Sequence, residues 1–266
     1  MASALVRQRT AFPGRTLARL GLAVVVPLAG LVLWAASARF GWLPPQILPA
    51  PDIVFGTFAD MLRSGELLDH TRISLLRVAL GFGLGATAGL LLGTAMGLWP
   101  TFEDYARPLF TVVAQVPALG WIPLLMLLVG IDETLKVLVI AKAALVPVTL
   151  NTRGGIRAVP PAYVEVGSTF RFNRRQLLRK VVLPAAVPPI FAGVRYGLTQ
   201  SWLALVAVEL LASSEGLGYL LVWGRQMFWL DTVIVAMVLI GVVGFVMDRT
   251  LRAVETRLQR WRVASL

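Results

Sequence analysis

The sequence predicts an all-α membrane protein with six transmembrane helices. Composition is the first observation, because 57% of the 266 residues are hydrophobic and only 15% are charged, whereas a soluble domain carries about 25% charged residues. Patterning is the second, because the apolar residues gather into runs of about twenty, the length that crosses a bilayer as a helix. The distribution of basic residues between the runs is the third, and it gives the orientation.

The apolar runs define the six spans and leave no internal repeat or long linker, so we expect one domain over residues 1–266. The "AASA" at 35–38 resembles a signal-peptide cleavage site, but the first run is longer than the roughly 7–15 residues of a signal-peptide core. We therefore expect it to remain as an uncleaved span. The predicted spans cover residues 19–38, 79–99, 107–130, 134–151, 188–212 and 231–248.

Basic residues collect on one side of these spans, which predicts the cytoplasmic side. The net charge of +11 is then a topology signal and not a sign of nucleic-acid binding. Both termini are expected inside the cell. The other side holds Arg39, Arg63, Arg72, Arg77, Lys136 and Arg225. The cytoplasmic side holds Arg7, Arg9, Arg15, Arg19, Arg107, Arg153, Arg157, Arg171, Arg174, Arg175, Arg179, Lys180, Arg249, Arg252, Arg257, Arg260 and Arg262.

Small residues and prolines mark the second to fourth spans. Glycines four residues apart clear a groove for close helix approach, either as fixed packing within one subunit or as a contact that slides during transport. Pro117, Pro123 and Pro147 are expected to interrupt the third and fourth spans, which points to a water-lined path. The glycine ladder consists of Gly81, Gly85, Gly89, Gly93 and Gly97.

Few ionisable side chains fall inside the spans, and each needs a partner or a purpose, because a charge at the bilayer centre costs about 2.5–3.5 kcal/mol on insertion scales. Arg195 and Glu209 lie near the ends of the fifth span, where they can reach the interface. Lys142 lies near the middle of the fourth, as a contact for an anionic solute or as a paired or snorkelling lysine. The candidate substrate path is Lys142, Gln115, Gln200 and Glu209.

The sequence lacks the residues that metal binding, ATP binding and catalysis usually require. The sequence has no cysteine and one histidine, so we expect no metal site. Its three lysines do not follow glycine, which excludes the phosphate-binding Gly-Lys motif of ATPases. No clustered catalytic side chains occur, so we expect neither an enzyme nor a cofactor in this chain. A secondary carrier remains an alternative, although it would usually show carboxylate relays within the membrane.

A basic segment, residues 153–187, separates the fourth and fifth spans. Four arginines and a lysine fall within residues 171–180. Proline at 160 and 161 suits the entry to a helix, and Pro184, Pro188 and Pro189 are expected to end the element before the fifth span. The pattern predicts a helix, a turn and a second helix, which insert into a groove on a partner protein or lie on anionic lipid.

This segment resembles the cytoplasmic loop motif of ABC-importer permeases: Glu-Ala-Ala, three residues, Gly, nine residues, Ile-x-Leu-Pro. Glu165 begins it with "EVG" (Glu165, Val166, Gly167), and Val181, Leu183 and Pro184 close it at the same spacing. Arg171 replaces the motif glycine. Because arginine reaches positive φ less readily than glycine, the turn is expected to shift toward Asn173, which tolerates that region better.

The resemblance extends over nearly the whole chain, to the nitrate/sulfonate/taurine branch of these permeases. It implies a MetI-like type I importer fold in a bacterial inner membrane, and a homodimer working with two ATP-binding subunits, which hold ATP and Mg²⁺, and an extracytoplasmic solute-binding protein. It implies Glu165 as the main anchor of the loop on the ATPase, with Arg171 and Arg174 as further contacts. The solute is expected to be an aliphatic sulfonate, taurine or nitrate, or alternatively an uncharged or heterocyclic compound. The segments that carry it are "LPAPDIVFGTF", "SLLRVALGFGLG", "VPALGWIPLLMLLVGI", "GVRYGLTQSWLALVAVELLASSEGLGYLL" and "DTVIVAMVLIGVVG".

Overall fold

The computed structural model describes residues 13–44 and 46–258, with side chains from residue 25 onward, and the described part is helical without a strand. The tail arginines at 7, 9, 260 and 262 lie outside the described residues. The elements are α1 (Pro13–Phe40), α2 (Pro51–Ser64), α3 (Glu66–Leu98), α4 (Pro100–Gln115), η1 (Ala118–Trp121), α5 (Ile122–Val129), α6 (Glu133–Arg157), α7 (Pro161–Thr169), α8 (Arg174–Leu177), η2 (Leu178–Val182), α9 (Leu183–Ala212), α10 (Leu217–Gln226) and α11 (Leu230–Leu258).

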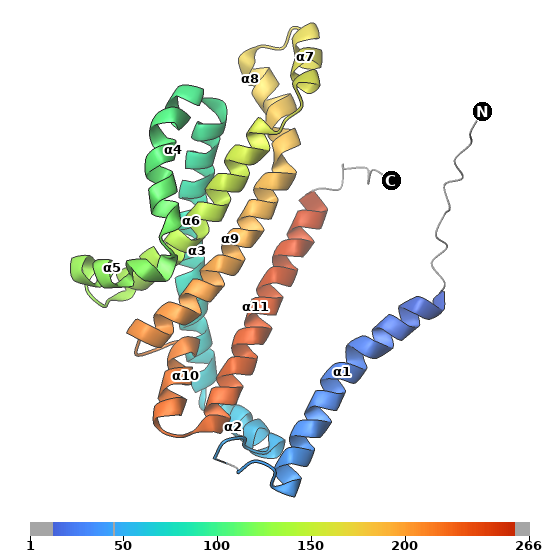
Figure 1. Ribbon diagram of the computed structural model, residues 1–266, viewed down its shortest axis with the longest axis vertical. Helices are drawn as coiled ribbons and strands as arrows, with labels where there is room; N and C mark the ends of the chain where they lie inside the picture. Colours follow the sequence, from blue (N-terminus) through green and yellow to red (C-terminus); the bar gives the residue numbers. More distant parts are fainter. Residues whose placement is uncertain (1–12, 45, 259–266) are drawn as a thin grey trace.

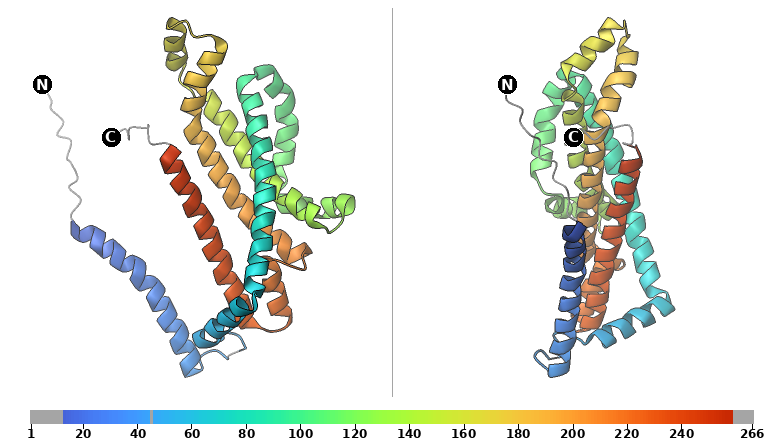
Figure 2. Two further views of the ribbon diagram at one scale, coloured as in Figure 1. Left: turned by 180° about the vertical axis from the view of Figure 1, so that it is seen from behind. Right: turned by 90° about the vertical axis from the view of Figure 1, so that its right-hand side faces the viewer.

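Three long helices, α3, α6 and α9, lie side by side at the centre of the molecule (Figure 1). Helix α11 runs beside α9, and α1 stands apart from the bundle and meets α2 at its base. Helices α7 and α8 lie at one end of the bundle, whereas α2 and α10 lie at the opposite end (Figure 2). The two ends of the bundle therefore carry different elements, the helices of the basic loop at one end and α2 and α10 at the other.

Close packing of α3 on α6 depends on the glycine ladder. A Cβ added to Gly89 would lie 2.9 Å from the carbonyl oxygen of Leu145, and one on Gly97 would lie 3.0 Å from Ile156 Cβ. At Gly85 an added Cβ would collide with the backbone carbonyl of Ala141. The ladder brings the two backbones together along most of their length, as small residues do between membrane helices.

Length and hydropathy identify three membrane-spanning candidates among the described residues: Glu66–Leu98, Arg174–Ala212 and Leu230–Leu258. The pair Pro100–Gln115 and Ala118–Val129 would make a fourth if it crosses as one bent span. The expected second, fifth and sixth spans thus correspond to long apolar helices. The total of six stays a prediction, because α6 is not among these candidates and the side chains of α1 are described only from residue 25.

The expected third span, 107–130, is interrupted at Pro117, as the sequence indicates, but it begins earlier than expected and changes direction at the break. Helix α4 already begins at Pro100 and ends at Gln115, and the chain then turns by 92° into η1 and α5. Pro117 has no N–H to continue the helix, and the N–H of Gly120 bonds to the carbonyl of Pro117, 3.0 Å away, instead of reaching one residue further back. Pro123 follows at the start of α5, where proline is accepted.

Other prolines do not break their helices as expected. Pro147 lies inside the continuous α6, buried between α3 and α9, and packing from neighbouring helices supports such a proline. Pro184, Pro188 and Pro189 lie within α9, which continues directly from α8. The wider turn of η2 makes this possible, since the N–H of Leu183 bonds to the carbonyl of Leu178 five residues back.

Candidate functional site: the basic loop, a lysine-lined cavity and a buried ion-pair network

The basic loop forms a helix, a tight turn and a second helix at one end of the bundle (Figure 1). Helix α7 packs against the start of the next helix through Gly167, where an added Cβ would lie 2.7 Å from Leu177 Cδ1. Glu165, Arg171 and Arg174 project from the loop as exposed side chains. The segment thus presents charged groups at the tip while its own packing keeps the two helices together.

The turn lies at Arg171 and not at Asn173. Arg171 adopts φ +55°, the left-handed conformation that the motif glycine would take without strain. Asn173 has φ −71° and begins α8 instead: its side chain accepts from the N–H of Gln176 at 2.8 Å, and the Gln176 side chain accepts from the N–H of Asn173 at 2.9 Å. Asparagine is a preferred helix cap, so the cap fixes Asn173 and leaves the strained position to Arg171.

Residues of the loop motif also border a wide groove between α6, α7, α9 and the end of α11. The groove has a volume of 1140 Å³, and Val166, Val181 and Pro184 line it together with Lys180. Tyr163 and Val166 are each 56% exposed. An apolar surface of this size on a helix pair suits contact with another protein.

A second cavity, of 390 Å³, lies against the break between α4 and η1. Lys142 of α6 and Gln200 of α9 both line it, beside Tyr196, whose hydroxyl accepts from the Gln200 amide at 2.8 Å. The Lys142 ammonium donates to the carbonyl of Val116. Two of the four expected path residues therefore share this cavity, while Gln115 is exposed at the adjoining end of α4. The cavity can offer a cation, an amide and a hydroxyl to one small solute.

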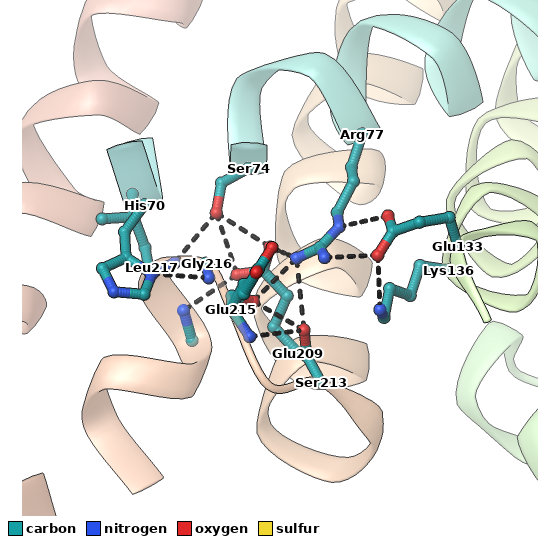
Figure 3. Close-up of polar contacts among 11 residues, drawn as sticks. His70, Ser74, Arg77, Glu133, Lys136, Glu209, Ser213, Glu215, Gly216 and Leu217 are labelled. Atoms are coloured by element: carbon teal, nitrogen blue, oxygen red, sulfur yellow. Dashed lines mark hydrogen bonds and ion pairs between the residues drawn. The ribbon is translucent and has the colours of Figure 1, made fainter. Parts of the chain in front are cut away.

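Glu209, the fourth expected path residue, lies elsewhere, and it does not reach the interface. Its side chain is fully buried and takes part in a network at the end opposite the basic loop (Figure 3). It pairs with Arg77 at 2.8 Å and accepts from the Ser74 hydroxyl at 2.8 Å and from the N–H of Gly218 at 2.9 Å. These donors satisfy the buried carboxylate, for which no partner could be identified from the sequence.

Arg77 joins this carboxylate to a second one, which sequence reasoning missed. Its Nε donates to Glu133 at 2.6 Å, and its Nη1 donates to the carbonyl of Glu215 at 2.8 Å. Lys136 also donates to Glu133 at 2.6 Å. Glu133 precedes the span predicted from residue 134, and the hydrogen bond from Arg77 is the main reason why its pKa falls to about 2. The network ties α3, α6, α9 and the loop after α9 together.

The loop after α9 is shaped around Glu209. Gly216 has φ +108°, and a side chain there would strike the Glu209 carboxylate. The N–H of Gly216 donates to Nδ1 of His70 at 2.9 Å. The sole histidine of the sequence thus holds a loop.

A smaller cluster joins α4 to α6 near the basic loop. Glu103 at the start of α4 is 2% exposed and pairs with Arg153 and Arg157 of α6. The sequence assigned these two arginines to the topology signal alone. Their pairing fixes the start of α4 against α6. Arg157 lies only four residues before α7 begins, so this contact is close to the basic loop.

The chain is similar in sequence to several transport permeases over most of their length. The chain is 38% identical over 239 residues to the aliphatic sulfonates transport permease SsuC of Bacillus subtilis, with 90% of this chain and 87% of the relative covered. It is 31% identical to the taurine transport permease TauC of Escherichia coli (87% and 86% covered) and 32% identical to the bicarbonate transport permease CmpB of Synechococcus elongatus (90% and 89% covered).

The fold is also that of a solved importer. A crystal structure of an amino acid ABC transporter with histidines superposes with a TM-score of 0.61 at 18% identity, covering 77% of this chain and 98% of that chain. Residues 85–260 match the family model described as binding-protein-dependent transport system inner membrane component. This chain therefore belongs to that family, the membrane-embedded permease subunits of ABC importers for small solutes.

Proposed function

We propose that this permease imports a small anion, of the class that includes alkanesulfonates, taurine and nitrate. The observation that carries the proposal is the cavity lined by Lys142, Gln200 and Tyr196, where an ammonium from the long helix α6 lies beside two neutral polar groups. A cation in the membrane is costly unless it serves a pathway or has a partner. The names of the relatives support the same class, since sulfonates, taurine at its sulfonate end and bicarbonate are all small anions.

In this proposal a separate ATPase supplies the energy for transport. Two copies of the chain pair with two ATP-binding subunits, which hold ATP and Mg²⁺, and a solute-binding protein delivers the anion on the opposite face. The exposed Glu165 anchors the α7–α8 loop on the ATPase, and Arg171 and Arg174 contribute at the tip. Both termini and this loop lie in the cytoplasm, as the basic residues favour.

Uptake by the reconstituted assembly tests the choice of solute. Methanesulfonate and dimethyl sulfone differ by one charge at nearly the same shape. We expect Lys142→Met to reduce methanesulfonate-dependent uptake at least tenfold, since about 1.4 kcal/mol of lost anion binding changes occupancy tenfold, while Lys142→Arg retains most of it. Equal uptake by Lys142→Met and the original chain would exclude Lys142 from the path.

The role of the loop has its own test. Glu165→Ala is expected to leave the assembly intact in the membrane but to abolish the solute-dependent increase in ATP hydrolysis, because the loop no longer transmits movement. Thr169→Ala is the control, since its hydroxyl only bonds back to the carbonyl of Glu165 at 3.0 Å. Stimulation that survives Glu165→Ala would count against this anchor without affecting the choice of solute.

A further inference from the structure

The break between α4 and η1 leaves backbone carbonyls, that of Val116 among them, to be satisfied from outside the helix. In a continuous helix the N–H of Gly120 would bond to Val116, but here it bonds to Pro117. Val116 itself has extended backbone angles, φ −78° and ψ 119°. A freed carbonyl at membrane depth requires a donor from a neighbouring element.

Lys142 is that donor. Its ammonium reaches from α6 to the Val116 carbonyl across 26 residues of sequence. The same ammonium lines the 390 Å³ cavity, of which Pro117, Ala118 and Leu119 form another wall. One side chain thus touches both the proposed solute site and the hinge of the broken helix.

The segment beyond this hinge contacts α6 along one face only. Ile122 is 4% exposed and packs with Leu135 and Val139 of α6, whereas Leu127 and Leu128 on the other face are 83% and 67% exposed. The partly buried Leu125, Met126 and Val129 join the same cluster. Helix α5 projects sideways from the bundle in Figure 1 and in the left view of Figure 2. Loss of the Lys142 contact would therefore free the hinge and leave this apolar face of α5 as the remaining hold on the segment.

We infer that Lys142 is a latch on the η1–α5 limb and that an anion entering the cavity releases the limb by taking the ammonium from Val116. The inference rests on the proposed function, because it needs an anion in that cavity. A charged acceptor forms a shorter and stronger bond to an ammonium than a peptide carbonyl does. Release is therefore specific: an anion opens the hinge, and an uncharged solute of the same shape leaves the latch in place.

Distance measurements between spin labels test the latch directly, because the sequence has no native cysteine. Labels at Leu127→Cys on α5 and Leu138→Cys on α6 report the limb against the core. The sample is the permease–ATPase assembly in lipid nanodiscs, with labelled chains diluted into unlabelled ones. Methanesulfonate is expected to broaden the distance distribution and shift it, and dimethyl sulfone is expected to leave it unchanged. Lys142→Met is expected to give the broad distribution without any solute.

Gln200→Leu is the matched control, since Gln200 lines the same cavity without contacting Val116; its solute-free distribution should stay narrow. A narrow distribution in Lys142→Met would overturn the latch, even if uptake of methanesulfonate still requires Lys142. A methanesulfonate effect that persists in Lys142→Met, or that is absent from the original chain, would overturn release by the anion. Undiminished uptake of methanesulfonate by Lys142→Met would instead overturn the proposed solute path. The uptake assay is separate from the spin-label distances, so the two proposals can fail independently.

Discussion

Two regions of this permease differ in how tightly they are packed. The core of α3, α6 and α9 is joined by a glycine ladder and, at the end opposite the basic loop, by an ion-pair network, so that backbones touch and the Arg77–Glu209 pair is buried. The limb formed by η1 and α5 leaves α4 at an angle of 92°, and its helix packs on the core along one face only. The core resists internal rearrangement, whereas the limb depends on a few contacts that can be exchanged.

The difference suggests how movement divides between them. Close-packed elements shift as units, because interdigitated interiors do not deform continuously. The loop at α7 and α8 continues straight into α9, so displacement of the loop moves the core as one body. The limb can then respond separately, at the break beside Lys142.

Removing Glu209 should have the largest effect on the core. Glu209→Ala strands Ser74, the N–H of Gly218 and part of the Arg77 guanidinium, and breaking a buried ion pair from one side costs about 3–5 kcal/mol. The expected result is a marked fall in thermal stability in detergent. Glu215→Ala is the control, because only its backbone carbonyl accepts from Arg77. Equal stability of the two variants would show that the network does not hold the core together.

Adding one methyl group to the ladder should have the next largest effect. Gly85→Ala places a Cβ against the Ala141 carbonyl, and overpacking of this kind costs about 1–3 kcal/mol. Gly83→Ala, on the same helix, meets nothing within 4 Å and should be tolerated. Thermal melting of the two variants side by side measures the difference. If Gly83→Ala destabilises as much as Gly85→Ala, the ladder is not the contact that matters.

A substitution at Pro117, where α4 ends, should have the smallest effect on stability of the three changes but should move α5. Pro117→Ala restores an N–H that allows α4 to continue, yet the site is exposed, so the free energy of unfolding should change by no more than about 0.5 kcal/mol. The distance from α5 to α6, measured with the Leu127 and Leu138 labels, should shift. Pro100→Ala, at the first turn of α4, should leave that distance unchanged. A limb that keeps its position in Pro117→Ala would mean that the bend has another cause.

The sequence reveals the core better than the limb. Apolar length alone predicted α3, α9 and α11, and the four-residue glycine spacing marked the face of α3 that meets α6. Proline indicates a break in the third span, and the break lies at Pro117, but periodicity does not encode the direction of the chain after a proline, so the 92° angle could not be predicted. The break expected at Pro147 is wrong, because neighbouring helices support the continuous α6.

Pairing across long separations was equally hidden. Arg77 and Glu209 lie 132 residues apart, and each was visible only as a charge at the end of an apolar run. Two opposite charges at the same membrane level were the available signal. The loop motif was found by its spacing, but the competition between Arg171 and Asn173 for the turn was decided by a helix cap that lies two residues beyond the motif position.

Hydrogen–deuterium exchange of the assembled importer in nanodiscs tests the division between core and limb most directly. We expect slow exchange of the backbone amides along α3, α6 and α9 in every nucleotide state. Exchange over residues 116–129 should be faster, and it should increase further when methanesulfonate and ATP are present. Uniform exchange across both regions, or a solute-dependent change located in the core and absent from residues 116–129, would contradict this division.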